Sequence, residues 1–245
     1  MQLQFTKMHG TGNDFVVIDL ISQHYKLRAQ DVRRLADRHY GVGCDQVLVV
    51  EAPKNPNVDF RYRIYNADGE EVEQCGNGAR CFARFVRDKK LTGKRVIKVE
   101  TSAGVIELRV HANHEVEVNM GSPEFEPSKI PMVASARAQS YSLLVAGQEL
   151  EIGALSIGNP HAVLRVPDAR QADVEQLGPL IETHSNFPAC RACAAVVYGI
   201  SRGWLRDSVT VALPGGKLSV SWAGEGHPVI MIGPTAVVFD GAIKI

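Results

Sequence analysis

Two segments far apart in this sequence resemble one another, and this self-similarity constrains the fold more than any other feature. Gly12-Asn13-Asp14-Phe15-Val16-Val17 is matched by Gly158-Asn159-Pro160-His161-Ala162-Val163, and in each half a helix-like stretch and a cysteine pair follow. The pairs are Cys75 with Cys81 and Cys190 with Cys193. Repetition of this kind predicts two copies of one structural unit. Two copies can place equivalent groups opposite each other across a pseudo-two-fold axis.

The second copy is shorter than the first. Gly12 and Cys75 are 63 positions apart, whereas Gly158 and Cys190 are 32 apart, so 31 positions have no counterpart. Residues 121–133, with three prolines and no apolar period, indicate a linker between the copies. We therefore expect one half at residues 1–120, joined by a C-terminal strand at 235–245, and a second half at 121–234.

Apolar periodicity predicts a mixed α/β (α+β) fold. Alternating or continuous apolar runs predict strands at 15–19, 47–50, 59–65, 96–100, 105–110 and 115–119, and a strand pair around Asp240-Gly241 within 236–245. Helical spacing predicts helices at 31–39, capped by Asp31, and at 79–87, 174–182 and 192–200. Gly215-Gly216 predicts a hairpin turn.

Composition excludes several classes of function. The 245 residues carry 27 basic and 27 acidic side chains, without the basic excess that a nucleic-acid or membrane surface requires as a partner. No apolar run approaches the roughly 18 residues of a spanning helix, and the first residues lack the pattern of a signal peptide. We expect a cytoplasmic protein whose five cysteines are thiols.

The segment Cys75-Gly76-Asn77-Gly78 places a thiol where a helix is expected to open. A helix N-terminus has unpaired N–H groups and a partial positive charge, which stabilise a thiolate. Glycines let the backbone approach an anion closely, so the same turn could bind a carboxylate. A thiolate beside a bound carboxylate lies near that acid's α-carbon. With a second thiol on the opposite face, this arrangement suits a cofactor-independent racemase or epimerase.

Other interpretations of these residues remain open. Cys44, Cys81 and Cys193 are typical of small buried apolar residues, and Cys190, whose turn lacks glycines, allows the same interpretation. The Cys190-x-x-Cys193 spacing is only a weak indication of a zinc site or a redox pair. His161 could bind a strand carbonyl or act beside the second thiol.

Five motifs occur in the order found in one known family: HGTGNDFVVID, GVGCDQVLVVE, YNADGEEVEQCGNGARCFARFV, IGNPHAV and GPTAVVFDG. The sequence in this respect resembles diaminopimelate epimerase. The resemblance implies a PLP-independent enzyme with no cofactor and no metal, which interconverts LL- and meso-diaminopimelate in lysine and peptidoglycan precursor synthesis. It also implies two similar domains, each a mixed sheet wrapped around a central helix, with the substrate in the cleft between them.

The resemblance also assigns roles to residues. It implies that Cys75 and Cys190 are the catalytic thiols and that His161 tunes them. It implies a homodimer formed through residues near Phe239, where a tyrosine is usual. The substrate-binding positions implied are Asn13, Gln46, Asn66, Gly76, Asn77 and Asn159.

The sequence departs from the family pattern in two ways. Thr11 and Cys44 replace a usual leucine and phenylalanine, and a family segment that holds the substrate is absent between Pro188 and Ala189. Three hypotheses follow: an active epimerase of diaminopimelate; a shortened relative that folds and binds ligand or dimerises without catalysis; or a racemase or isomerase of the same fold that acts on another amino acid.

Overall fold

The computed structural model describes residues 2–72, 75–130, 132–182 and 192–245. The chain forms two compact units. The first contains the chain up to Asn119 together with 210–219 and 231–245, and the second contains 120–209 and 220–230. That the two halves are copies of one unit stays a prediction. No helix among the described residues is long and apolar enough to cross a membrane.

A large mixed sheet forms the framework of the first unit, and parts of three of its strands, β12, β13 and β14, belong to the second unit. Among the described residues its strand order is β12-β13-β14-β8-β7-β6-β4-β3-β2-β1-β15, with β5 paired to β4. Strands β2 and β3 are parallel, as are β4 and β6. The strands are β1 Gln2–Gly10, β2 Asn13–Asp19, β3 Gln46–Glu51, β4 Phe60–Asn66, β5 Glu71–Val72, β6 Val96–Thr101, β7 Gly104–Val110, β8 Val116–Asn119, β12 Ser208–Leu213, β13 Gly216–Trp222, β14 Val229–Gly233 and β15 Ala236–Lys244.

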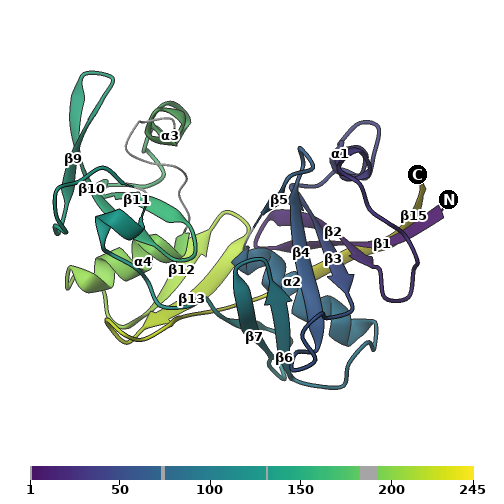
Figure 1. Ribbon diagram of the computed structural model, residues 1–245. Coiled ribbons are helices and arrows are strands. Elements are labelled where there is room, and N and C mark those ends of the chain that lie inside the picture. Colours follow the sequence, from purple (N-terminus) through teal and green to yellow (C-terminus); the bar gives the residue numbers. More distant parts are fainter. Residues whose placement is uncertain (1, 73–74, 131, 183–191) are drawn as a thin grey trace. The chain divides into compact units, whose positions relative to one another are not determined.

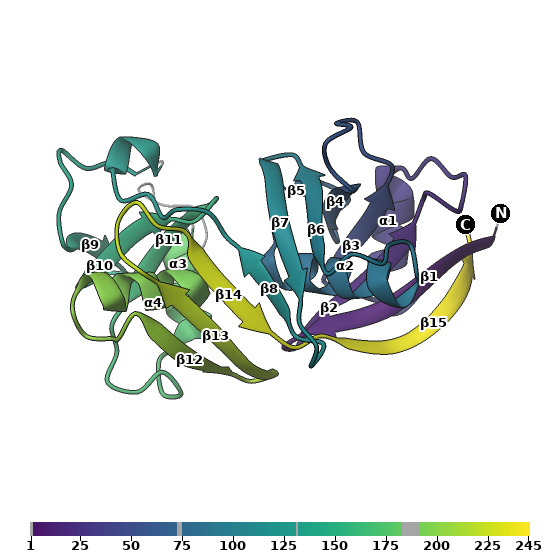
Figure 2. The ribbon, with the colours of Figure 1, turned by 90° about the horizontal axis from the view of Figure 1, so that it is seen from below.

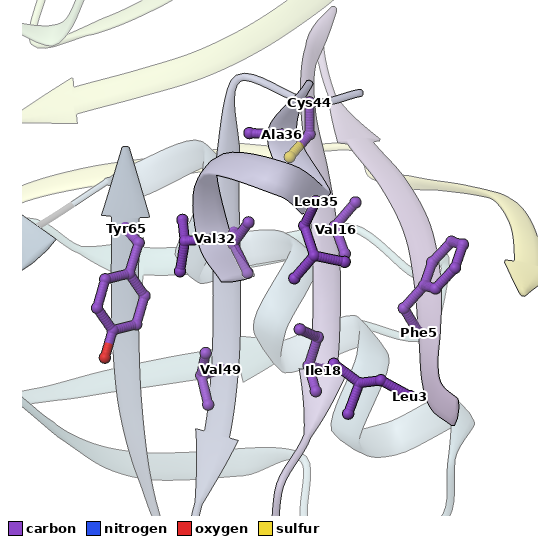
Figure 3. Close-up of a cluster of buried hydrophobic side chains, with 11 residues drawn as sticks. Leu3, Phe5, Val16, Ile18, Val32, Leu35, Ala36, Cys44, Val49 and Tyr65 are labelled. Atoms are coloured by element: carbon purple, nitrogen blue, oxygen red, sulfur yellow. The ribbon is translucent and has the colours of Figure 1, made fainter. Parts of the chain in front are cut away.

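In the central strands β2 and β3 both faces of the sheet are apolar, and a helix packs on each face. Side chains alternate between the faces of a strand, and the buried runs of β2 and β3 have apolar residues at successive positions. Val16 and Val49 belong to the cluster that packs against Val32 and Leu35 of α1 (Ala29–Ala36), as Figure 3 shows. The opposite face carries Phe15, Leu48 and Tyr62.

Helix α2 (Gly76–Asp88) lies on that opposite face, within the curve of the strands (Figures 1 and 2). The ring of Phe82 packs 4.7 Å from that of Tyr62 and 6.1 Å from that of Phe60, measured between centroids. The helix also contacts β1, β7 and β8. Its first turn is buried at Gly78, and an ideal Cβ there would lie 2.4 Å from the Tyr62 hydroxyl. The absence of a side chain therefore allows the N-terminus of α2 to touch the sheet.

Several predictions for the first unit are wrong in detail, including those for α1 and for the C-terminal residues. Helix α1 spans Ala29–Ala36 and not 31–39, so Asp31 is its third residue and not its N-cap. Asp31 still helps to cap the helix, because its carboxylate accepts a hydrogen bond from the backbone N–H of Arg28, the N-cap residue. The C-terminal residues form one continuous strand, β15, and not a pair. Asp240 and Gly241 lie opposite Thr6 and Phe5 of β1, so this neighbouring strand keeps the segment extended (Figure 1).

The second unit has a three-stranded antiparallel sheet in the order β11-β10-β9. Leu177 and Ile181 of α3 pack against the cluster on one face, which includes Ile152 and Ala154. Helix α4 crosses the other face, where the ring of Tyr198 fills the space beside Gly153. The elements are η1 Pro127–Lys129, β9 Tyr141–Val145, β10 Gln148–Ser156, β11 Pro160–Leu164, α3 Val174–Glu182 and α4 Ala192–Ser201.

Candidate active site

Cys75 occupies the N-cap position of α2. Its backbone is extended, with φ −142° and ψ 109°, and its sulfur accepts a hydrogen bond from the backbone N–H of Gly78 at 3.4 Å. The Gly-Asn-Gly segment, expected to be a turn before the helix, is the first turn of the helix itself. The side chain is 1% exposed. The sulfur of Cys75 is thus directed at N–H groups that lack a partner within the helix.

A tight hairpin between β1 and β2 brings Asn13 to this sulfur. Thr11 and Gly12 both have positive φ, 54° and 97°, as a two-residue hairpin turn requires. Gly10 pairs with Asn13, and a Cβ on Gly10 would lie 3.2 Å from the carbonyl oxygen of Asn77. Oδ1 of Asn13 consequently lies 3.8 Å from Sγ of Cys75 and 3.4 Å from Nδ2 of Asn77.

Gln46 and Asn66 form a second pair of amides. They lie opposite each other on β3 and β4, and Nε2 of Gln46 donates to Oδ1 of Asn66 at 2.8 Å. Gln46 is 5% exposed, yet its Oε1 is buried without a hydrogen-bond partner among the described residues. The pair therefore leaves Oε1 of Gln46 as a buried acceptor without a donor in the described part of the chain. Buried acceptors in proteins nearly always receive a hydrogen bond, from a ligand or a water molecule where the protein supplies no donor.

The three amide side chains carried by strands, those of Asn13, Gln46 and Asn66, lie at one end and on one face of the sheet. Parallel strands β2 and β3 begin at Asn13 and Gln46, and antiparallel β4 ends at Asn66. Asn13 is two residues from Phe15, Gln46 two from Leu48 and Asn66 two from Ile64, so they project to the face that α2 covers. The first unit thus gathers the amide side chains and the N-terminus of α2 at one place.

The second unit holds two more of the predicted residues. Asn159 is half-buried in the turn before β11, and its carbonyl accepts from the N–H of Ile157. His161 is 3% exposed and pairs with Leu155 of β10. By alternation it projects to the face that α4 covers. Cys190 lies outside the described residues.

An ion-pair network that the sequence patterns did not indicate lies beside Asn13. Arg38 contacts the carboxylates of Asp14 and Asp45 at 2.9 and 2.8 Å, and Lys7 lies 2.6 Å from Asp14. Burial acts to raise the pKa of Asp14, but hydrogen bonds from Arg38 and Lys7 outweigh it and hold that pKa well below its usual range. A cavity of about 480 Å³ is lined in part by these residues. The available signal was that each aspartate adjoins a predicted amide, in Asn13-Asp14 and Asp45-Gln46.

Arg80 is a further buried polar residue that the motif alone did not reveal. It is fully buried on α2, and Nη2 donates to Thr11 Oγ1 at 3.4 Å while Nη1 lies 3.2 Å from the sulfur of Met231. Its guanidinium also lies 3.3 Å from the position that a Cβ on Gly10 would take. Arg80 therefore supports the hairpin that carries Asn13.

The other described cysteines differ from Cys75 in their surroundings. Cys44 and Cys81 are buried in apolar packing, as predicted, and burial raises the pKa of Cys44 to about 12. Burial also raises the pKa of Cys81. Cys193 is partly exposed, which differs from the prediction for it. Cys44, Cys75 and Cys81 are free thiols, and among the described cysteines only Cys75 occupies a helix N-cap.

Phe239 lies on β15 and is 46% exposed. Its ring and that of Phe5 on β1 pack nearly at right angles, with centroids 5.9 Å apart and an interplanar angle of 77°. Its neighbours Val237 and Val238 are 44% and 54% exposed, so three consecutive apolar residues face solvent on the strand at the edge of the sheet.

Comparison with known proteins decides the family. The family profile described as Diaminopimelate epimerase matches residues 5–126. Diaminopimelate epimerases of Pseudomonas syringae pv. tomato and Pseudomonas entomophila are 50% and 51% identical to this chain, and each alignment covers all of both sequences. The chain belongs to the diaminopimelate epimerase family. Both alignments with family members run over 276 positions, 31 more than the 245 residues of this chain.

Solved structures agree on the fold. A hydroxyproline epimerase from Agrobacterium vitis matches with a TM-score of 0.66 at 14% identity, covering 99% of this chain and 92% of that one. The predicted class is confirmed: a mixed α+β fold with a large mixed sheet and few helices.

The difference of 31 positions between this chain and its alignments with family members equals the number of positions that the second half lacks relative to the first.

Proposed function

We propose that this chain interconverts LL- and meso-diaminopimelate without a cofactor, with Cys75 and Cys190 as acid and base. The observation that carries the proposal is the sulfur of Cys75 at the N-cap of α2, beside Asn13 and Asn77. Membership of the diaminopimelate epimerase family supports the substrate. The reaction would belong to lysine and peptidoglycan precursor synthesis in the cytoplasm, where thiols remain reduced.

The chemistry is a proton transfer at the α-carbon. One thiolate removes the α-proton, and the electron pair left on carbon delocalises into the substrate carboxylate. The opposite thiol then donates its proton to the other face, so one sulfur ends as thiol and the other as thiolate. Backbone N–H groups of Gly76 and Asn77, at the positive end of α2, would stabilise the charge that develops on the carboxylate.

The remaining site residues are proposed to hold the substrate in place. Asn13, Gln46, Asn66 and Asn159 can donate and accept hydrogen bonds without adding charge, which suits a zwitterion. The buried Oε1 of Gln46 is an acceptor that a substrate ammonium group could satisfy. His161, buried on β11, is proposed to adjust the proton affinity of the thiols.

We also propose that the active form is a homodimer. Support comes from the edge strand β15, where Val237, Val238 and Phe239 expose apolar surface in succession. Exposed edge strands pair with other chains unless charge, proline or a covering element prevents it. A second copy would cover both the apolar side chains and the strand edge.

A second candidate function follows from the length of the chain. It is 31 positions shorter than its alignments with full-length relatives, and missing residues near Cys190 would remove substrate contacts. On this view the chain folds and binds ligand or dimerises but does not turn over. A same-fold enzyme for another amino acid is the third possibility, because the contacts to the distal end of the substrate are those that a missing segment would supply.

Proton exchange tests these candidates. The purified chain is incubated with LL-diaminopimelate in ²H₂O, and NMR follows the loss of the α-proton and the formation of the meso isomer. The proposal predicts both signals, and a loss of about 10²- to 10⁴-fold in the Cys75→Ala variant. Cys44→Ala, which removes a buried thiol outside the site, should retain activity within a few-fold.

The alternatives give different results in the same assay. A wild-type chain that exchanges no α-proton, but whose unfolding temperature rises with added diaminopimelate, supports the shortened relative without catalysis. Exchange with another amino acid, and none with diaminopimelate, supports the third possibility. Full turnover by Cys75→Ala contradicts the role assigned to this thiol.

A further inference from the structure

The amide of Asn13 has a defined orientation, and Asp45 sets it. Oδ2 of Asp45 accepts a hydrogen bond from Nδ2 of Asn13 at 2.9 Å. An ionised carboxylate only accepts hydrogen bonds, so it favours the NH₂ end of an amide over the oxygen end. The amide oxygen of Asn13 must then face the other way, where it lies 3.8 Å from Sγ of Cys75 and 3.4 Å from Nδ2 of Asn77.

Asp45 is itself fixed on several sides. Its Oδ2 accepts from the backbone N–H of Asp14 at 3.1 Å, and its own N–H donates to Oδ1 of Asp14 at 2.9 Å. Arg38 donates to Oδ1 of both carboxylates. Two aspartates at the starts of neighbouring strands thus accept hydrogen bonds from each other's backbone N–H, and Arg38 bridges the two carboxylates. This arrangement leaves Asp45 little freedom to release Asn13.

The consequence for Cys75 lies in the two hydrogen-bonding groups that face its sulfur. The N–H of Gly78 is a donor and favours the thiolate, whereas Oδ1 of Asn13 is an acceptor and can bind only a protonated thiol. A thiol that alternates between acid and base needs both states to be accessible. If the Asn13 amide rotated, its NH₂ would face the sulfur and would also favour the thiolate. The protonated thiol of Cys75 would then have lost its hydrogen-bond acceptor.

We propose that Asp45 is a positioning residue for this site: through Asn13 it keeps an acceptor on the sulfur of Cys75 and prevents rotation of the amide. This inference rests on the proposed function, in which Cys75 alternates between thiol and thiolate. It assigns a role to a residue outside the set of predicted substrate-binding positions. Asp45 is half-exposed, with 46% of its side chain accessible, so its replacement should not prevent folding.

Alkylation of Cys75 tests the inference without requiring turnover. The full chain is treated with iodoacetamide at fixed pH, and peptide mass spectrometry gives the rate at each cysteine. Asp45→Asn should accelerate alkylation of Cys75 about 2- to 10-fold, because an asparagine at position 45 can turn either its oxygen or its NH₂ toward Asn13. The amide of Asn13 is then no longer held in one orientation, and the thiolate of Cys75 is favoured. Asp59→Asn is the matched control. Asp59 also accepts from one backbone N–H and one cationic side chain, those of Lys98 and Lys94, and the rate should not change.

A double-mutant cycle separates positioning from a structural role. If Asp45 acts through Asn13, then Asp45→Asn should have little further effect in an Asn13→Ala background. The same non-additivity should hold for kcat/KM, which Asp45→Asn alone should lower about 10- to 100-fold. Fully additive effects, or an unchanged alkylation rate in Asp45→Asn, overturn the inference.

Failure of the proposed function looks different. Suppose that the wild-type chain does not exchange the α-proton, but Asp45→Asn still accelerates alkylation of Cys75 and does so only when Asn13 is present. The catalytic proposal is then refuted, and the positioning role of Asp45 stands. If the wild-type chain is active, and the Asp45→Asn variant has the same alkylation rate at Cys75 and the same kcat/KM, only the positioning role is refuted.

Discussion

The sulfur of Cys75 lies 3.8 Å from Oδ1 of Asn13, although 62 positions separate the two residues in the sequence. Two close backbone approaches make this contact possible. Gly10 lets the first turn of α2 approach β1, and Gly78 lets the same turn approach β2, β3 and β4. The geometry of the candidate site therefore depends on positions where a side chain is absent.

We predict that Gly78→Ala damages both stability and the site. A Cβ at this position would lie 2.4 Å from the hydroxyl of Tyr62 and 3.1 Å from Leu48, so the start of α2 must shift. Overpacking of this kind costs about 1 to 3 kcal/mol of unfolding free energy, and the shift should also lower kcat. Gly93→Ala is the control, since no atom lies within 4 Å of its Cβ position. Equal unfolding curves for the two variants would contradict the prediction.

Replacement of Arg80 by alanine should destabilise the first unit strongly. The side chain is fully buried and contacts Thr11 and Met231, so its removal leaves a cavity and takes away the donor to the Thr11 hydroxyl. We expect a loss of about 2 to 4 kcal/mol in urea unfolding, comparable to other large-to-small core substitutions. Arg84→Ala, four residues later, removes only a surface pair with Asp88 and should cost about 0.5 kcal/mol or less. A similar small loss for both arginines would argue against this role.

The carboxylate of Asp31 should make stability depend on pH. Burial acts to raise its pKa, but hydrogen bonds from Arg28 outweigh burial and lower the pKa below the ordinary 3.8. A depressed pKa in the folded state gives stability that is present above the unfolded value and is lost as pH falls through the folded one. We therefore expect Asp31→Asn to be about 1 kcal/mol less stable than wild type at pH 7, with the difference shrinking below pH 4.

Thermal unfolding at pH 7 and pH 3 checks this expectation. Asp207→Asn serves as the control, because the side chain of Asp207 is exposed and makes no hydrogen bond or ion pair within the described part of the chain. A stability difference between Asp31→Asn and wild type that is the same at both pH values would show that the charge of Asp31 is not responsible.

The fold class and the elements that carry the candidate site could be predicted from the sequence for a physical reason: both depend on local patterns. Continuous apolar runs marked β2 and β3, and the glycines after Cys75 marked the start of a helix. Such signals come from residues that are neighbours in the chain. The predicted start of α2 lay three residues after the observed one, because the Gly-Asn-Gly segment is compatible with a turn as well as with a helix.

Long-range contacts could not be predicted in the same way. The edge position of β15 depends on pairing with β1 across more than 200 residues, and the local Asp240-Gly241 pattern suggested a turn instead. The network of Lys7, Asp14, Arg38 and Asp45 joins four separate segments, and each side chain taken alone resembles an ordinary surface charge. Only the fold brings them together beside Asn13.

The exposed face of β15 should determine the oligomeric state. If a second copy covers it, Phe239→Lys introduces a charge into an apolar interface and should convert the dimer to a monomer in analytical ultracentrifugation. Val105→Lys is the matched control, since Val105 is also exposed, at 54%, on a different strand of the same unit, and should leave the mass unchanged. Lysine on an edge strand discourages pairing by its charge. A wild-type chain that sediments as a monomer at all concentrations contradicts the proposal, as does a Phe239→Lys variant that remains dimeric.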